Sequence, residues 1–204
     1  MARPRSGSSR LGRLAAAVGL LMCLALAGCA VERPVPASLP PPREIGPPPI
    51  ISGYGERVGA GGRTRGWPHY GIDIRVPVGT PVLAATDGTV IRTGTHRNSG
   101  RLVVVAHVDD LATVYWHLSE IEVESGQAVR RGQPLGRSGM TGNATTPHLH
   151  FGVCRRPLGQ CGNHIDAGWD DPAAWWVEGS PCFAPERAYG PGPVRLTYPL
   201  PCRG

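Results

Sequence analysis

Two histidines, His148 and His150, stand one residue apart in a short apolar run. Side chains alternate between the two faces of a β-strand, so both imidazoles are expected on one face. Leu149, Phe151 and Val153 are expected to point into a core. Imidazole binds metals and exchanges protons near neutral pH, so this run predicts one edge of a chemical site.

Two further runs, at residues 69–74 and 113–118, show a similar alternation. In the first, one face would carry His69, Gly71 and Asp73, and the other Tyr70, Ile72 and Ile74. In the second, one face would carry Thr113, Tyr115 and His117, and the other Val114, Trp116 and Leu118. Three strands are therefore predicted to offer imidazole groups to a common face.

A catalytic zinc site usually has three nitrogen or oxygen protein ligands and leaves a fourth position for water. His69, Asp73 and His150 can supply such a set. A lone His-x-His or His-x-x-x-Asp pair is weak evidence, because either can occur by chance on a surface. The combination is much more specific.

The elements that must position these residues are short apolar runs separated by Gly, Pro and Asp. They lie at residues 71–76, 81–85, 88–93, 102–108, 112–118, 133–137 and 148–153. Many short strands at close spacing, without a long stretch of helical periodicity, predict an all-β or β-rich fold. We place a single folded domain at residues 51–177. Trp169, Trp175 and Trp176 are expected to pack over the sheet, with an aromatic shelf for peptide or glycan as the alternative.

The N-terminal residues read as an export signal with a lipid-attachment site. Arginines precede an apolar segment, residues 14–27, that is short for a membrane span. Leu26-Ala27-Gly28-Cys29 resembles the lipobox of bacterial lipoproteins, which predicts a signal peptide at residues 1–28 and lipidation of Cys29. The alternative is ordinary signal cleavage after Ala27, with Cys29 incidental. Ala30 is not acidic, which favours the outer membrane, facing the periplasm, in a double-membraned bacterium.

Residues 29–50 are rich in proline and predict an extended tether. Polyproline II rises about 3.1 Å per residue, so the segment could hold the domain up to about 60 Å from its anchor. A disordered tail without a spacing role is the alternative. The formal charge of +6 is concentrated in the signal, since removing its four arginines leaves 17 basic residues against 15 acidic ones. Nucleic acid is therefore not the expected partner.

Four cysteines remain after the signal and lipobox: Cys154, Cys161, Cys182 and Cys202. In an exported protein, disulfides are favoured over thiolate metal ligands. Four cysteines allow three pairings, and proximity favours Cys154 with Cys161 and Cys182 with Cys202. The second pair would staple a Pro/Gly-rich tail at residues 178–204.

Three motifs together resemble those of the M23 (lysostaphin and LytM-like) zinc peptidases. They are His69-Tyr70-Gly71-Ile72-Asp73, Tyr115-Trp116-His117-Leu118 and His148-Leu149-His150-Phe151. The resemblance covers about residues 51–153. It implies a mostly antiparallel β fold of the LytM type, with a duplicated hybrid motif and an open groove. Asn98-Ser99-Gly100-Arg101 departs from the Gly-Tyr-Gly-Asn that relatives often carry, and the Cys154/Cys161 insertion is also unusual.

Carried over by position, the resemblance implies one zinc ion bound by His69, Asp73 and His150. His117 and His148 would be the unligated catalytic pair. His148 would accept a proton from the attacking water, and His117 would stabilise the developing oxyanion. The implied substrates are the stem peptides of peptidoglycan, cut at a D-alanyl to meso-diaminopimelate bond or at a glycine bridge.

Two other functions compete with peptidoglycan hydrolysis. Lipoproteins with degenerate versions of this domain activate cell-wall amidases, but they tend to lose ligands, and all five positions are retained here. The other function, that of a periplasmic zinc-holding protein, would explain the ligands but gives no role to His117 and His148. Three further histidines, His96, His107 and His164, match no family ligand and are expected in turns or on the surface. Asp109-Asp110 predicts a hairpin turn.

Overall fold

The computed structural model describes residues 46–56, 68–155, 161, 168–177, 182–184 and 194–202. The signal, Cys29, residues 30–45 of the tether and His164 lie outside these ranges. Within them, no helix combines the length and apolar character needed to cross a membrane. The helical element found among these described residues is a short 3-10 turn, η2 (Pro172–Trp175).

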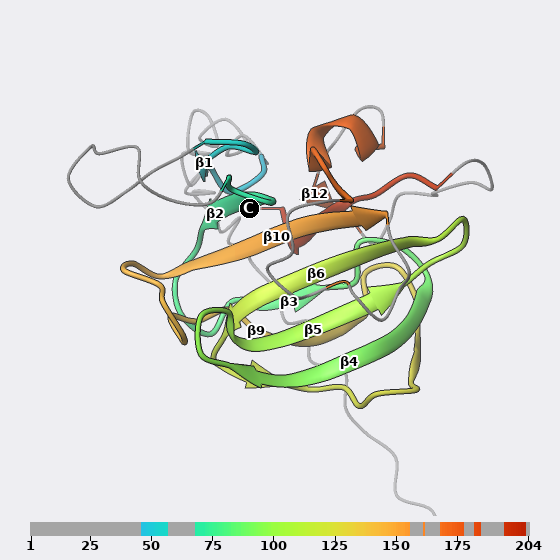
Figure 1. The fold of residues 1–204 in the computed structure, drawn as a ribbon, viewed down its shortest axis with the longest axis horizontal. Helices are drawn as coiled ribbons and strands as arrows, with labels where there is room; N and C mark the ends of the chain where they lie inside the picture. The colour runs from blue at the N-terminus through green and yellow to red at the C-terminus, as the bar shows by residue number, and fades with distance from the viewer. Residues whose placement is uncertain are drawn as a thin grey trace, which may run out of the picture. The chain divides into compact units, whose positions relative to one another are not determined.

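The main sheet is antiparallel and lies across the described domain (Figure 1). Its strands are β1 (Ile50–Ser52), β2 (Ile72–Arg75), β4 (Gly88–His96), β5 (Gly100–Ala106), β6 (Leu111–Leu118), β8 (Ala128–Val129), β10 (His148–Arg155) and β11 (Trp169–Asp170). The order is β1-β2-β10-β6-β5-β4-β8, with β11 added to β10. Each of the seven predicted runs overlaps a strand, so the β-rich fold is confirmed. The short strands β1, β8 and β11 were not predicted.

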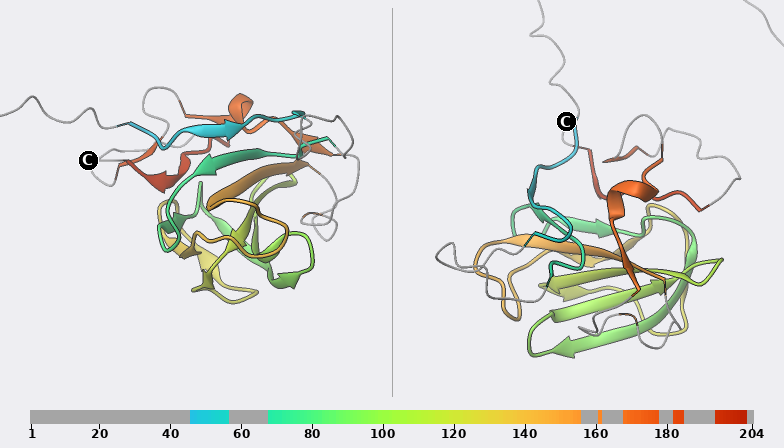
Figure 2. Two further views of the ribbon diagram at one scale, coloured as in Figure 1. Left: turned by 90° about the vertical axis from the view of Figure 1, so that its left-hand side faces the viewer. Right: turned by 45° about the horizontal axis from the view of Figure 1, so that its top comes forward.

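Two smaller groups of strands complete the fold. One is a three-stranded antiparallel sheet ordered β3-β9-β7, formed by β3 (Pro81–Leu83), β7 (Glu120–Ile121) and β9 (Pro134–Arg137). The other is a parallel pair, β12 (Cys182–Phe183) and β13 (Tyr198–Pro201). The first strand, β1, runs along β2 at the edge of the main sheet (Figure 2).

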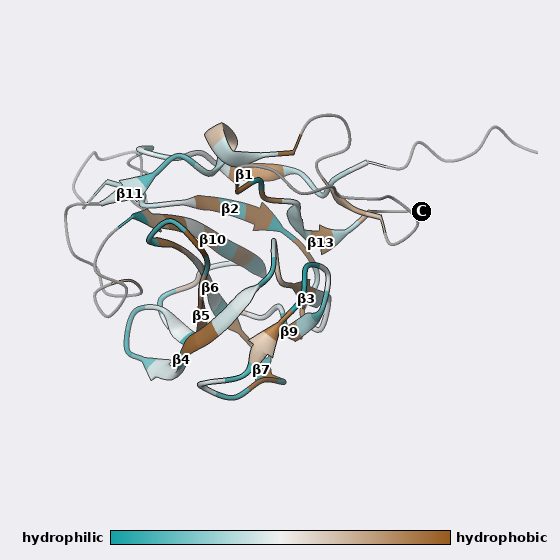
Figure 3. Ribbon diagram, turned by 90° about the vertical axis from the view of Figure 1, so that its right-hand side faces the viewer, coloured by the Kyte–Doolittle hydropathy of each residue, from teal (hydrophilic) through white to brown (hydrophobic). Residues whose placement is uncertain are grey.

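The principal core joins one face of the main sheet to the other strands. It contains Ile72 and Ile74 of β2, Leu149, Phe151 and Val153 of β10, Val82 of β3, Leu135 of β9 and Leu200 of β13. The hydrophobic segments of β2 and β10 lie side by side (Figure 3). The strand alternation predicted for residues 148–153 is therefore confirmed, and it directs His148 and His150 to the opposite face.

A second apolar cluster covers that opposite face. Its buried members are Tyr70, Leu102, Val104, Ala112, Val114, Trp116, Cys154, Cys161 and Trp169. Tyr70 was predicted to share a face with Ile72 and Ile74, which is wrong: it stacks on Trp169, with ring centroids 5.8 Å apart. Tyr70 precedes the first paired residue of β2, so strand alternation does not fix its direction.

A bulge near the end of β6 changes the predicted direction of two side chains, His117 and Leu118. Arg101 pairs with Leu118 but Val103 pairs with Tyr115, so β6 has one extra residue in this interval. His117 sits there with a φ of 63°. Tyr115 and Leu118 both enter the principal core, whereas Trp116 lies on the opposite face. The predicted grouping of His117 with Tyr115, and of Leu118 with Trp116, was therefore wrong.

The connection between β5 and β6 is the predicted hairpin turn at Asp109-Asp110. Both residues have positive φ, 60° and 54°, as in the two-residue turns that match the twist of paired strands. Beside this turn, His107 is buried rather than on the surface, which corrects its expected exposure. Its Nδ1 lies 2.7 Å from the Asp87 carbonyl and its Nε2 2.8 Å from Thr113 Oγ1. Two polar partners explain how an imidazole is accommodated there.

Both predicted disulfide pairings are present, Cys154 with Cys161 and Cys182 with Cys202. The described residues after Trp176 also reach the principal core, where Leu196 and Leu200 are fully buried. At the other end, the Pro48 carbonyl accepts a hydrogen bond from Tyr198. The domain boundaries at residues 51 and 178 stay predictions. Trp169, Trp175 and Trp176 pack against the two cores, as expected.

Candidate metal and catalytic site

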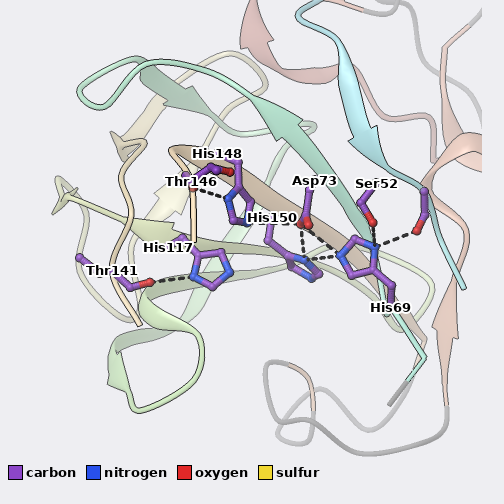
Figure 4. A network of polar contacts seen from close by, with 9 residues as sticks. Ser52, His69, Asp73, His117, Thr141, Thr146, His148 and His150 are labelled. Carbon is purple, nitrogen blue, oxygen red and sulfur yellow. Dashed lines mark hydrogen bonds and ion pairs between the residues drawn. The ribbon is translucent and has the colours of Figure 1, made fainter. Parts of the chain in front are cut away.

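Three side chains from two distant parts of the sequence meet on the face of the main sheet opposite the principal core (Figure 4). Asp73 of β2 lies directly opposite His150 of β10. His69, which precedes β2, reaches the same point. The His69 Nε2 is 3.1 Å from Asp73 Oδ1 and 3.0 Å from His150 Nδ1, and His150 Nδ1 is 3.0 Å from Asp73 Oδ1. The structure thus brings together all three predicted ligands.

This triangle of donor atoms fits a zinc ion. A tetrahedral site with zinc–ligand bonds of about 2.0–2.2 Å separates its donors by about 3.3–3.6 Å, a few tenths of an ångström more than the separations observed here. Two imidazoles and a carboxylate are also a common donor set for zinc. The His69 Nδ1 donates to the Gly53 carbonyl at 2.7 Å, so in the neutral ring the Nε2 lone pair faces the other two donors. The donor set and the tautomer therefore both suit a metal.

The ring of His150 is held between its neighbours. On one side it stacks on Trp116, which is paired with it across β10 and β6; the centroids are 4.3 Å apart and the planes 12° apart. Near its other edge is Gly71, where an added Cβ would lie 2.8 Å from His150 Nε2 and 2.4 Å from the Phe151 carbonyl. His150 Nε2 is buried and has no hydrogen-bond partner among the residues that the structure describes. Packing thus directs Nδ1 toward His69 and Asp73.

Two more imidazoles lie beside the donor triangle without belonging to it (Figure 4). The rings of His117 and His148 are 4.7 Å apart, and His148 Nε2 is 3.5 Å from Asp73 Oδ1. The His117 Nδ1 donates to the Thr141 carbonyl at 2.8 Å, and the His148 Nδ1 donates to the Thr146 carbonyl at 2.7 Å. In the neutral rings, each Nε2 is consequently a hydrogen-bond acceptor.

The bulge in β6 places His117 in this group. Strict alternation after Trp116 would direct the next side chain into the principal core. Instead, the His117 N–H donates to the Ser99 carbonyl at 2.9 Å, and its ring is 6.2 Å from that of His150. Two loops, at Ser99 and Thr141, therefore hold the backbone and the ring of His117.

Burial and charge set the protonation of the site. Burial lowers the pKa of His117 to about 4, and the charge of His150 adds to the effect. Burial also lowers the pKa of His150 to about 4, against the opposing influence of Asp73. For Asp73, burial opposes ionisation, but hydrogen bonds from His150 and His69 hold its pKa well below the usual value. At neutral pH the site thus has a carboxylate and neutral His117 and His150 rings.

The residues that orient the histidines were not singled out from the sequence. Gly53, Thr141 and Thr146 act through backbone carbonyls, which any residue type could supply. Trp116 was assigned to the face opposite His117, although it packs on His150. The glycine in the motif at residues 69–73 was the available signal, because a glycine is required where two backbones approach too closely to admit a Cβ.

Comparison with known proteins agrees with this geometry. Residues 67–166 match the family model described as Peptidase family M23. The chain is 49% identical over 84 residues to the peptidoglycan DD-endopeptidase ShyA of Vibrio cholerae, covering 41% of this chain and 20% of ShyA. It is 44% identical over 89 residues to ShyB of the same organism, covering 44% of this chain and 21% of ShyB. The chain thus spans about a fifth of the length of these relatives.

The solved structure of LytU is also similar. Its identity to this chain is 31% and its TM-score is 0.51, and the match covers 60% of this chain and 80% of the LytU chain. The likeness extends over most of LytU, so it concerns the whole β domain rather than an isolated motif. The fold expected from the sequence is confirmed by this likeness.

Proposed function

The chain belongs to peptidase family M23, and from that premise we propose that it is a zinc-dependent endopeptidase that hydrolyses the peptide cross-links of peptidoglycan. The observation that carries the proposal is the arrangement of five side chains. The donor atoms of His69, Asp73 and His150 lie close together. Beside them are the acceptor nitrogens of His117 and His148. Relatives named as peptidoglycan DD-endopeptidases support the substrate class.

In this proposal, His69 Nε2, Asp73 Oδ1 and His150 Nδ1 hold the zinc ion. When bound, zinc supplies a Lewis acid that lowers the pKa of a water molecule and polarises the scissile carbonyl. Stacking on Trp116 fixes the His150 ring, and the Gly53 carbonyl fixes the His69 tautomer. The protein's contribution is thus to keep the three donors close and correctly oriented before substrate binds.

His148 and His117 supply the acid–base chemistry. Each has its Nδ1–H engaged by a backbone carbonyl, so each neutral ring can accept a proton at Nε2. A ring that has taken a proton from water can then donate that proton to the departing amine, which must be protonated to leave. The role first expected for His117, donation to an oxyanion, needs an N–H at Nε2. We therefore propose that neutral His117 accepts a hydrogen bond from the attacking water instead.

The test is incubation of the purified protein with cross-linked muropeptides, with product masses and zinc content measured on the same samples. We expect cleavage of a peptide bond by the wild-type protein with one zinc per chain. Asp73→Ala should lose both zinc and activity. A zinc-replete wild-type protein that cleaves no cross-link would overturn the proposal, and would favour activation of a cell-wall amidase as the function.

We also propose an envelope location through a lipid anchor at Cys29, with residues 30–50 as a tether. The support is the order of arginines, apolar segment and Leu26-Ala27-Gly28-Cys29. Palmitate labelling of cells producing wild-type or Cys29→Ser protein tests it. Label and membrane association should depend on Cys29, and a labelled, membrane-bound serine variant would contradict the anchor.

A further inference from the structure

A surface pocket of about 330 Å³ lies next to the catalytic histidines and is used by no step described above. It is lined by Thr95, His96, Arg97, Gly100, Arg101, Thr141 and Gly142. These residues come from the turn between β4 and β5 and from the loop that follows β9. The volume suits a small polar group or one amino-acid residue rather than a large cofactor.

The pocket shares its walls with the loops that hold His117. Thr141 lines the pocket, and its carbonyl accepts the hydrogen bond from His117 Nδ1. Thr141 Oγ1 accepts a hydrogen bond from the Arg101 N–H at 2.9 Å, and Gly100 is in close contact with the Thr141 backbone. A single residue, Thr141, therefore lies between a group bound in the pocket and the His117 ring.

The pocket carries positive charge. The exposed side chains of Arg97 and Arg101 line it, and no acidic residue among the described ones forms an ion pair with either. Arg101 Nη1 donates to the Ser119 carbonyl at 2.9 Å, which holds its side chain across the end of β6. This contact uses one of the five guanidinium N–H donors and leaves the others for a ligand. Two arginines placed in this way suit a carboxylate.

We propose that this pocket binds the carboxylate on the amine side of the scissile bond. This inference rests on the proposed function. In a D-alanyl to meso-diaminopimelate cross-link, the carbon that bears the scissile nitrogen also bears a free carboxylate. A glycine bridge has no such group at the scissile nitrogen. A basic pocket beside His117 thus selects the diaminopimelate cross-link and resolves which of the two bonds is cut.

The experiment compares three substrates: a diaminopimelate-cross-linked dimer with that carboxylate free, the same dimer with it amidated, and a glycine-bridged dimer. For wild-type protein we expect kcat/KM to be about 10- to 100-fold higher on the free carboxylate than on the amide, since hydrogen bonds to charged groups are the strong ones. Arg101→Gln and Arg97→Gln should reduce this ratio. Arg130→Gln is the control, because Arg130 is an exposed arginine outside the pocket. Equal rates of wild-type protein on the free-carboxylate and amidated dimers would overturn the proposal. An unchanged ratio of these two rates in both Arg101→Gln and Arg97→Gln would also overturn it.

A binding measurement separates failure of the pocket from failure of the enzyme. The probe is the monomeric muropeptide with a free or an amidated diaminopimelate carboxylate, titrated calorimetrically into each variant. Wild-type protein should bind the free form more tightly, and Arg101→Gln should bind both forms alike. This difference is expected even if no cross-link is cleaved. Loss of the difference in Arg130→Gln, or its absence in wild type, would contradict the assignment. Circular dichroism confirms that each variant is folded.

Discussion

The ring of His150 stacks on Trp116, its partner across β10 and β6, with 4.3 Å between centroids. The contact belongs to the second apolar cluster, so the packing of that cluster and the position of a proposed zinc ligand are coupled. Trp116 is 3% exposed, and its side chain is therefore one wall of the metal site rather than a surface residue.

Trp116→Ala should consequently weaken zinc binding as well as the fold. Loss of a residue that orients a ligand commonly reduces metal affinity about 10- to 100-fold, and truncating a buried tryptophan reduces the free energy of unfolding by about 3–5 kcal/mol. Trp116→Phe keeps an aromatic face and should retain more of the affinity. Chelator competition and urea denaturation measure the two quantities. Wild-type zinc affinity in a folded Trp116→Ala protein would show that the stacking does not position His150.

His117→Ala and His148→Ala should keep zinc but lose turnover. Neither ring belongs to the donor triangle, and both present an acceptor nitrogen beside it. Acid–base catalysis of this kind is typically worth about 100- to 10,000-fold in rate. Muropeptide cleavage and elemental analysis should be carried out on the same preparations. Near-normal turnover by a zinc-replete His148→Ala protein would argue against its catalytic role.

Gly71→Ala should separate β2 from β10 at the site. The new Cβ would lie 2.4 Å from the Phe151 carbonyl and 2.8 Å from His150 Nε2, and a backbone atom cannot move away cheaply. We expect at least about tenfold weaker zinc binding and a loss of about 1–3 kcal/mol in the free energy of unfolding. Gly46→Ala is the matched control, since nothing lies within 4 Å of its Cβ position. Equal behaviour of the two variants would be inconsistent with the close approach.

His107 should make the fold less stable in acid. Burial lowers its pKa to about 4; the Asp87 carbonyl opposes this shift and Arg131 reinforces it. The unfolded chain, with a histidine pKa of about 6.5, therefore binds a proton before the folded one does. The stabilisation is complete above about pH 6.5 and is lost as the pH falls toward 4, by about 3 kcal/mol in all.

His107→Gln removes this titration while keeping a polar side chain. The difference between the unfolding free energies of wild type and variant should therefore shrink as the pH is lowered from 7 to 4. Urea denaturation at several pH values measures it, and subtracting the variant removes the contribution of the other buried histidines. A difference that does not depend on pH would mean that the pKa of His107 is the same in the folded and the unfolded protein.

The sequence by itself determined the proposed ligand set and most of the sheet. His148 and His150 lie within a strand whose apolar residues are all buried, so alternation alone fixed their face. The same holds for Asp73 between Ile72 and Ile74. The seven runs were identifiable because burial on one face requires apolar residues at a period of two, and burial on both faces requires a continuous apolar run. The disulfide pairings followed from proximity along the chain.

Only the tertiary structure decided the position of His117. Local alternation directs its side chain into the principal core, but the bulge opposite β5 and the contacts with Ser99 and Thr141 turn it toward His148. The burial of His107 and the basic pocket beside Thr141 also depend on loops that meet across the fold. Such contacts join residues tens of positions apart. Because backbone carbonyls form them without regard to residue type, they leave no signature in a single sequence.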